Sequence, residues 1–222
     1  MNAAIIACAT LEAELRLAME KTGCNYPVFW LKAGDHNSPS RRKQEILRAL
    51  DNCGEFDTVL LAMAFCGSAA EGIAAGHHTL ILPRCPDCLT LFLGSLQRRN
   101  ACQNLYLLTQ GWADGRDSIL REYAHCLETY GEKRTARIFR DMFRHYQGIG
   151  LITLPELPDP QAAFPATEFA ENLGLPLIRL EGNNQYLEDL LTGNFSEDRF
   201  LTIAPGNSVP SFCGFTGGDP HV

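Results

Sequence analysis

Short apolar runs recur along this chain, and segments with helical spacing separate them. The runs Ala3–Ala7, Val59–Phe65 and Thr79–Leu82 contain almost no polar residue, which is typical of strands that are covered on both faces. About eight such runs alternate with about seven helical segments, and this rhythm predicts βαβ units in a parallel sheet. The sequence therefore predicts an α/β fold with a mostly parallel sheet and alternating helices.

The rhythm restarts near residue 100, and this restart predicts two units. We expect two similar Rossmann-like lobes around a cleft, an N-terminal α/β lobe over residues 1–100 and a C-terminal α/β lobe over residues 101–222. The helical stretch Asp114–Tyr146, interrupted at Gly131, could span the two lobes. One continuous doubly wound sheet is the alternative. Within the first lobe, the alanine-rich segment Ser68–Ala75 predicts a short helix.

Charge and hydropathy exclude two classes of partner. The formal net charge is −7 and the densest basic patch is only Arg41–Lys43, so we expect no nucleic-acid partner. No apolar run approaches the roughly 18 residues that suggest a membrane span. The first residues lack the basic start of a signal peptide, so we expect a cytoplasmic protein.

Cysteine is frequent for a chain with no export signal. There are nine cysteines, and an odd number in a reducing compartment argues against a disulfide framework. Such cysteines are usually small buried hydrophobes, metal ligands or reactive thiols. High cysteine usage also fits the cytoplasm of an anaerobe, where oxidation is no threat.

Several of these cysteines directly follow apolar runs. Cys8 directly follows the first of the three runs named above, and Cys66 directly follows the second. Cys85 and Cys88 come shortly after the third. Because the carboxyl ends of parallel strands meet at one edge of a sheet, these thiols and His36 in the preceding loop are expected to converge there. Thiolates together with an imidazole select Zn²⁺ or another thiophilic ion. We therefore predict a metal site drawn from these five residues.

The turn after Cys66 carries a second hypothesis. Gly67 and Ser68 at a strand-to-helix turn would let backbone N–H groups face an anion. A helix that starts there would also lower the pKa of the thiol, which suits either a metal ligand or a nucleophile. A plain tight turn is the alternative for the same residues.

Three further side chains are candidates for substrate contacts or catalysis. Arg84 could hold a carboxylate or phosphate, and Asp87 could orient a ligand or act as a base. Trp112 offers an aromatic wall to the cleft. The alternatives are exposed loop charges for the first two and a core tryptophan for the third.

A set of short motifs resembles the domain-of-unknown-function 1638 family. They are A-C-x-T-L-x-x-E-L at Ala7–Leu15, H-N-x-P at His36–Pro39, F-C-G at Phe65–Gly67, P-R-C-x-D-C at Pro83–Cys88, L-G-S at Leu93–Ser95, T-x-G-W at Thr109–Trp112 and P-G at Pro205–Gly206. Members are typical of anaerobic bacteria and methanogens, and they often sit beside corrinoid proteins and methyltransferases for methylamines and related one-carbon donors. The resemblance thus implies a setting rather than a reaction.

Three functions remain open at this stage, and they leave open whether the protein is an enzyme. The first is a zinc thiolate protein of anaerobic one-carbon or corrinoid metabolism that assists methyl transfer, with corrinoid methyltransferase proteins as partners. The second is a metal-free enzyme with Cys66 as nucleophile and a small anionic substrate. The third is a non-catalytic accessory protein that binds a corrinoid or its metal.

Overall fold

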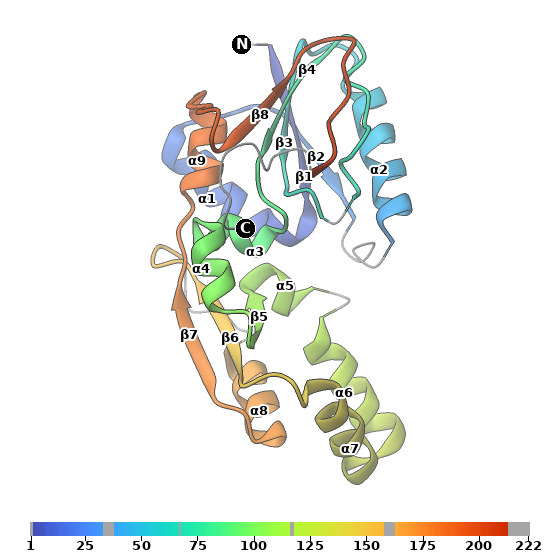
Figure 1. The fold of residues 1–222 in the computed structure, drawn as a ribbon, viewed down its shortest axis with the longest axis vertical. Coiled ribbons are helices and arrows are strands. Elements are labelled where there is room, and N and C mark those ends of the chain that lie inside the picture. Colours follow the sequence, from blue (N-terminus) through green and yellow to red (C-terminus); the bar gives the residue numbers. More distant parts are fainter. Residues whose placement is uncertain (1, 33–37, 67, 116–117, 158–162, 213–222) are drawn as a thin grey trace.

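The computed structural model describes residues 2–32, 38–66, 68–115, 118–157 and 163–212, and it shows a mixed α/β fold (Figure 1). The strands are β1 Ala3–Cys8, β2 Val28–Leu31, β3 Thr58–Ala62, β4 Thr79–Pro83, β5 Leu105–Thr109, β6 Gly148–Thr153, β7 Leu177–Glu181 and β8 Phe200–Ile203. The helices are α1 Glu12–Thr22, α2 Pro39–Asn52, α3 Cys88–Leu93, α4 Leu96–Ala101, α5 Gln110–Asp114, α6 Ile119–Tyr130, α7 Glu132–Phe143, α8 Ala163–Leu173 and α9 Gln185–Thr192, with a 3₁₀ turn η1 at Ala9–Leu11. No helix within the described ranges is both long and apolar enough to cross a bilayer.

The first sheet has the strand order β2-β1-β3-β4-β8. Its pairs are parallel except the last, in which β8 runs antiparallel to β4. Along β1, Ile5 and Ala7 face one apolar cluster with α1, whereas Ala4 and Ile6 face another with α2. Because both faces are buried, the strands consist of continuous apolar runs.

The second sheet has the order β5-β6-β7, with parallel pairs throughout. Helices α6, α7 and α8 pack against one face of it. On the other face, Leu107 and Ile152 belong to the same buried cluster as Ile5 and Phe92 of the first sheet. The expected α/β fold with a mostly parallel arrangement and alternating helices is confirmed, and its two sheets share one apolar core.

The C-terminal part of the chain returns to the first sheet. After β7, α9 packs against α1, and β8 pairs with β4 (Figure 1). The boundary expected at residue 100 therefore separates the two sheets but not all of their elements, since α9 and β8 come from the second half of the chain. An antiparallel edge strand needs no crossover helix, so strand alternation alone does not reveal it.

The helix expected at Ser68–Ala75 does not form. The described residues there make turns, with the Glu71 amide donating to the Ser68 carbonyl at 3.2 Å. Gly72 and Gly76 have φ values of 66° and 61°, a left-handed conformation that a right-handed helix cannot contain. No α-helix therefore begins directly after Cys66 among the described residues.

The helical stretch after residue 114 does not bridge the sheets. It is split at Gly131, whose φ is 72°, into α6 and α7. The rings of Tyr123 and Phe139 pack edge-on against Phe169 of α8, with centroids 5.1 and 5.9 Å away. This aromatic cluster holds α6, α7 and α8 together on the second sheet.

A close backbone contact joins the two sheets. Thr109 caps α5, because its hydroxyl accepts a hydrogen bond from the Trp112 amide at 3.2 Å. The next turn of α5 lies against η1, and a Cβ added to Gly111 would be 2.0 Å from the Thr10 carbonyl oxygen. Only glycine permits this approach, so Gly111 sets how closely the end of β5 meets the end of β1.

We expect Gly111→Ala to lower the free energy of unfolding by about 3 kcal/mol, because the rigid backbone of η1 must shift to admit a methyl group. Urea unfolding followed by circular dichroism measures the change. Gly54→Ala is the matched control, since the nearest heavy atom to its added Cβ is 3.6 Å away. Equal stability of the two variants would contradict the close contact.

Candidate functional site

A small pocket lies where the carboxyl ends of strands from both sheets meet. Its volume is about 190 Å³. The first sheet contributes the segments after β1, β3 and β4, the second contributes the segment after β5, and α2 contributes its first residue. The lining residues are Thr10, Leu11, Pro39, Cys66, Asp87, Cys88, Thr109 and Trp112.

Two thiols face each other in this pocket. The sulfurs of Cys66 and Cys88 are 3.9 Å apart, within hydrogen-bond distance for sulfur. Cys88 starts α3 and is buried, whereas Cys66 is only partly buried. The hydrogen bond with Cys66 and burial raise the pKa of the Cys88 thiol well above its usual value. Cys88 therefore keeps its proton at neutral pH and can donate it toward the Cys66 sulfur.

The backbone at Cys66 is strained. Its φ is 48°, and no other non-glycine residue in the described part of the chain has a positive φ. This conformation costs roughly 1–2 kcal/mol for a residue with a Cβ. Strain of this kind is concentrated at sites where the surrounding structure holds a side chain in a required direction.

A third thiol lies in the same neighbourhood. The Cys8 sulfur is 3.0 Å from the Thr10 hydroxyl oxygen, and both residues are buried. Cys8 is also close enough to Cys88 for its charge to raise the pKa of that thiol. The structure thus brings Cys8, Cys66 and Cys88 together at the edge predicted from the sequence, while His36 lies outside the described residues.

Cys85 occupies a different environment from its partner in the C-x-x-C motif. It is fully buried, and the hydroxyl of Tyr186 on α9 donates a hydrogen bond to its sulfur. Burial raises the pKa of Cys85 to about 12. Beyond Tyr186, the Arg199 guanidinium stacks on the tyrosine ring and pairs with Asp189. Cys85 is not among the residues that line the pocket.

Asp87 acts as a helix cap. One carboxylate oxygen accepts hydrogen bonds from the Thr90 amide and hydroxyl, each at 2.7 Å, and the other pairs with Arg99 at 3.0 Å. The carboxylate is therefore engaged in fixing the start of α3, which positions Cys88. Arg84 lies beside the edge strand β8, since its Nε donates to the Phe200 carbonyl at 3.2 Å, and it is not among the residues that line the pocket.

The remaining candidates divide between the pocket and the surface. Trp112 lines the pocket from α5. Ser68 is exposed in the turn after Cys66, and Gly67 lies outside the described residues. Because no α-helix starts among the described residues of this turn, they supply no helix dipole of the kind expected to favour an anion or a thiolate at Cys66.

The arrangement of donors meets part of what a metal requires. At a zinc–sulfur distance of about 2.3 Å, two ligands of a tetrahedral site lie about 3.8 Å apart, close to the separation of Cys66 and Cys88. Within the described ranges, however, no group of three or more His, Cys, Asp or Glu side chains is placed to hold an ion. The fit is therefore good for one pair of sulfurs and incomplete for a full set of ligands.

Sequence reasoning missed Arg42. Its side chain is 1% exposed, and its Nη1 donates to the Lys32 carbonyl at 2.8 Å and to Glu45 at 3.1 Å. Its Nε and Nη2 have no hydrogen-bond partner among the described residues, and this pair of N–H groups has the spacing that binds a carboxylate. Arg42 lies four residues before the buried Ile46, so helical spacing could have placed it on the inner face of α2.

The family model for "Protein of unknown function (DUF1638)" matches residues 30–191, nearly three quarters of the chain. The chain belongs to this family. The matched range contains Cys66, Cys88 and Trp112 and begins after Cys8.

Two other comparisons add no functional information. No curated protein matches the chain. Among solved structures, a double variant of a Serratia marcescens short-chain dehydrogenase/reductase is 13% identical, over 89% of this chain and 90% of that chain, with a TM-score of 0.23. A likeness of that size carries no argument about fold or activity.

The buried thiols predict how stability depends on pH. Burial raises the pKa of Cys53 from 9.0 to about 11 and that of Cys85 from 9.0 to about 12. Above pH 9 the unfolded chain releases these protons before the folded protein does. The free energy of unfolding should therefore fall as pH rises from 9 toward 11, by on the order of 1 kcal/mol per pH unit for each group.

Urea unfolding across this range measures the slope, and Cys85→Ser should reduce it because serine does not titrate there while its hydroxyl can still accept from Tyr186. A slope unchanged in Cys85→Ser would contradict the assignment of this effect to Cys85.

Proposed function

We propose that the pocket binds a thiophilic metal ion, zinc in the first instance, through Cys66 and Cys88, with Cys8 as the third sulfur. The separation of 3.9 Å between the first two sulfurs carries this proposal. Cys8 would have to give up its hydrogen bond with Thr10 and move toward the other two sulfurs, since the described residues do not place three such ligands around one point. His36 stays a candidate for a further ligand from the neighbouring loop.

The side chains around the sulfurs suit this role. Asp87 and Arg99 fix the first turn of α3 and so hold Cys88 in place. Leu11 and Trp112 line the pocket and exclude water from the sulfurs, which strengthens electrostatic interactions there. A zinc ion bound here would supply a Lewis acid that keeps a substrate thiol ionised at neutral pH. The chain itself would orient that substrate between α3 and α5.

The proposed setting is anaerobic one-carbon metabolism in the cytoplasm, and it rests on the resemblance described above. A pocket of about 190 Å³ is smaller than most ligand sites, which span roughly 300–1,000 Å³. It suits a small thiol or a methylated one-carbon donor, whereas a corrinoid ring exceeds it. We therefore propose that a corrinoid, if it takes part, is presented by a partner methyltransferase protein at the mouth of the pocket.

A second candidate function is nucleophilic catalysis by Cys66 without a metal, on a small anionic substrate. The protonated state of Cys88 favours it, because a buried S–H group that donates to Cys66 would stabilise a thiolate there. Cys66 is also the more exposed of the two. For this second function, Cys88 acts as a hydrogen-bond donor to Cys66 rather than as a metal ligand.

Metal analysis of anaerobically purified protein tests the first candidate. We expect close to one equivalent of zinc or a related ion, and less than about 0.2 equivalents in Cys66→Ser and in Cys88→Ser, because a structural thiolate ligand is required for tight binding. Cys85→Ser is the matched control, since it changes the other cysteine of the same motif and should keep the metal. Wild-type protein with less than about 0.2 equivalents of any transition metal would refute metal binding.

Alkylation rates test the second candidate. After treatment with a chelator, iodoacetamide at neutral pH should modify Cys66 faster than any other described cysteine, and peptide mass spectrometry reads the rates. Cys88→Ala should slow the reaction at Cys66, because the donor that stabilises its thiolate is lost. Uniformly slow alkylation of the wild type would exclude a nucleophilic role for Cys66.

A further inference from the structure

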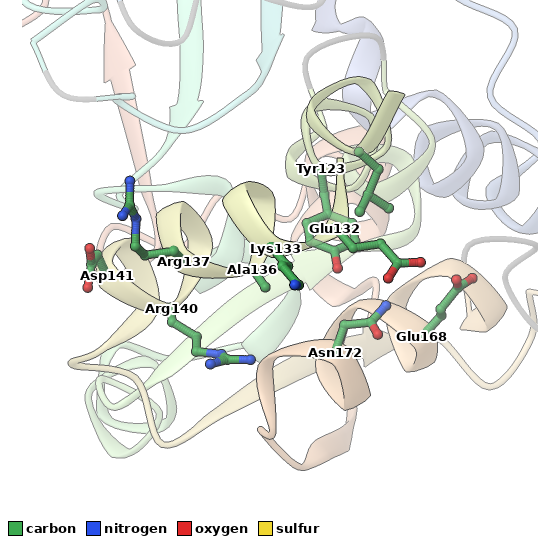
Figure 2. A pocket seen from close by; sticks show the side chains of 10 residues that line it. Tyr123, Glu132, Lys133, Ala136, Arg137, Arg140, Asp141, Glu168 and Asn172 are labelled. Atoms are coloured by element: carbon green, nitrogen blue, oxygen red, sulfur yellow. The ribbon is translucent and has the colours of Figure 1, made fainter. Parts of the chain in front are cut away.

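A groove on the second sheet's helical layer collects charged side chains of both signs. It lies among α6, α7 and α8, has a volume of about 740 Å³, and shares no lining residue with the thiol pocket (Figure 2). Volumes of roughly 300–1,000 Å³ are usual for sites that bind small molecules. The groove is therefore large enough for a metabolite.

The charges in this groove are partly sorted along its length, with the exception of Asp141, which lies beside Arg137 (Figure 2). Figure 2 shows Glu132 and Glu168 toward one end, Arg140 toward the other, and Lys133 between them. Lys133, Arg137 and Arg140 are four and then three residues apart on α7, and this spacing places them on one face of the helix. Glu168 reaches the groove from α8.

The cations of this groove are not paired with carboxylates of the described residues. None of Lys133, Arg137 and Arg140 forms an ion pair with a carboxylate in the described part of the chain. Charged side chains of opposite sign thus line one groove without meeting one another. A ligand that carries both signs can pair with both ends at once, whereas a ligand of one sign is repelled by one end.

Tyr123 lines the groove near Glu132 (Figure 2). Its ring is buried against Phe139 and Phe169, with centroids 5.0 and 5.1 Å away. Burial and the charges of Glu168 and Glu132 raise the pKa of its hydroxyl, and Arg140 lowers it. The hydroxyl therefore stays neutral at physiological pH and can donate or accept a hydrogen bond in the groove.

We propose that this groove binds a zwitterionic small molecule, with its ammonium group at Glu132 and Glu168 and its carboxylate or phosphate at Arg140 and Lys133. Leu127 and Ala136 also line the groove and offer apolar surface to the methylene groups of such a ligand. The class is that of amino acids and their longer homologues. This proposal is independent of the thiol site.

Calorimetric titration of the full chain with a series of zwitterions tests it. The probes are glycylglycine, β-alanine, γ-aminobutyrate, 5-aminovalerate and 6-aminohexanoate, which differ in the distance between their charges. Hexanoate and hexylamine are the controls that carry one charge each. We expect saturable binding of at least one zwitterion, weakened by added salt, and no comparable binding of either control.

Matched variants locate the site. Arg140→Gln and Glu168→Gln should each weaken binding at least about tenfold, whereas Arg134→Gln on the same helix and Glu171→Gln on α8 should leave it within about twofold. The control positions do not line the groove, and all four side chains are exposed, so folding should be unaffected. Binding by none of the zwitterions, equal binding of a singly charged control, or equal weakening in the control variants would overturn the proposal.

Discussion

Because both faces of the first sheet are buried, reactive side chains are confined to the ends of its strands. Ile5 and Ala7 face one apolar layer and Ala4 and Ile6 face the other, so a polar side chain within β1 would be buried without a partner. Such burial costs several kcal/mol unless a hydrogen bond compensates for it. The first reactive groups therefore occur where the backbone leaves the sheet, and three of them, Cys8, Cys66 and Cys88, meet there.

The contact between Thr10 and Gly111 turns this edge into a pocket. It brings Thr109 and Trp112, at and just after the end of β5, over thiols at or after the ends of strands of the first sheet. The apolar core shared by the two sheets also stabilises this contact, since Leu107 packs in one cluster with Ile5. The two sheets therefore cannot separate without exposing apolar surface, and the pocket lies at this shared boundary.

Local sequence patterns correctly predicted the features that depend on a single element and its burial. The apolar runs located the strands, and strand ends located Cys8, Cys66 and Cys88. The pattern could not show that Cys85 faces Tyr186, because that depends on α9 returning to the first sheet about a hundred residues later. Nor could it show that Gly72 would break the helix expected after Ser68, since glycine is tolerated in helices at a cost of about 1 kcal/mol. Tertiary contacts decided both cases.

Arg42 illustrates the same limit of local sequence patterns, here for the burial of a charged side chain. A basic triplet on a helix is usually solvated, and only the position of Ile46 on the same face indicates that the middle arginine is buried. The free-energy cost of burying the Arg42 guanidinium is partly offset by its hydrogen bonds to the Lys32 carbonyl and the Glu45 carboxylate.

The backbone at Cys66 bears most directly on what the pocket is for. A φ of 48° costs roughly 1–2 kcal/mol with any side chain except glycine, which adopts it freely. The turn needs the conformation, since the chain must leave β3 and reach the turns around Gly72. What residue 66 adds beyond a glycine is its sulfur, held 3.9 Å from that of Cys88. The strain therefore supports the proposal that this sulfur acts in the pocket, whether as a ligand or as a nucleophile.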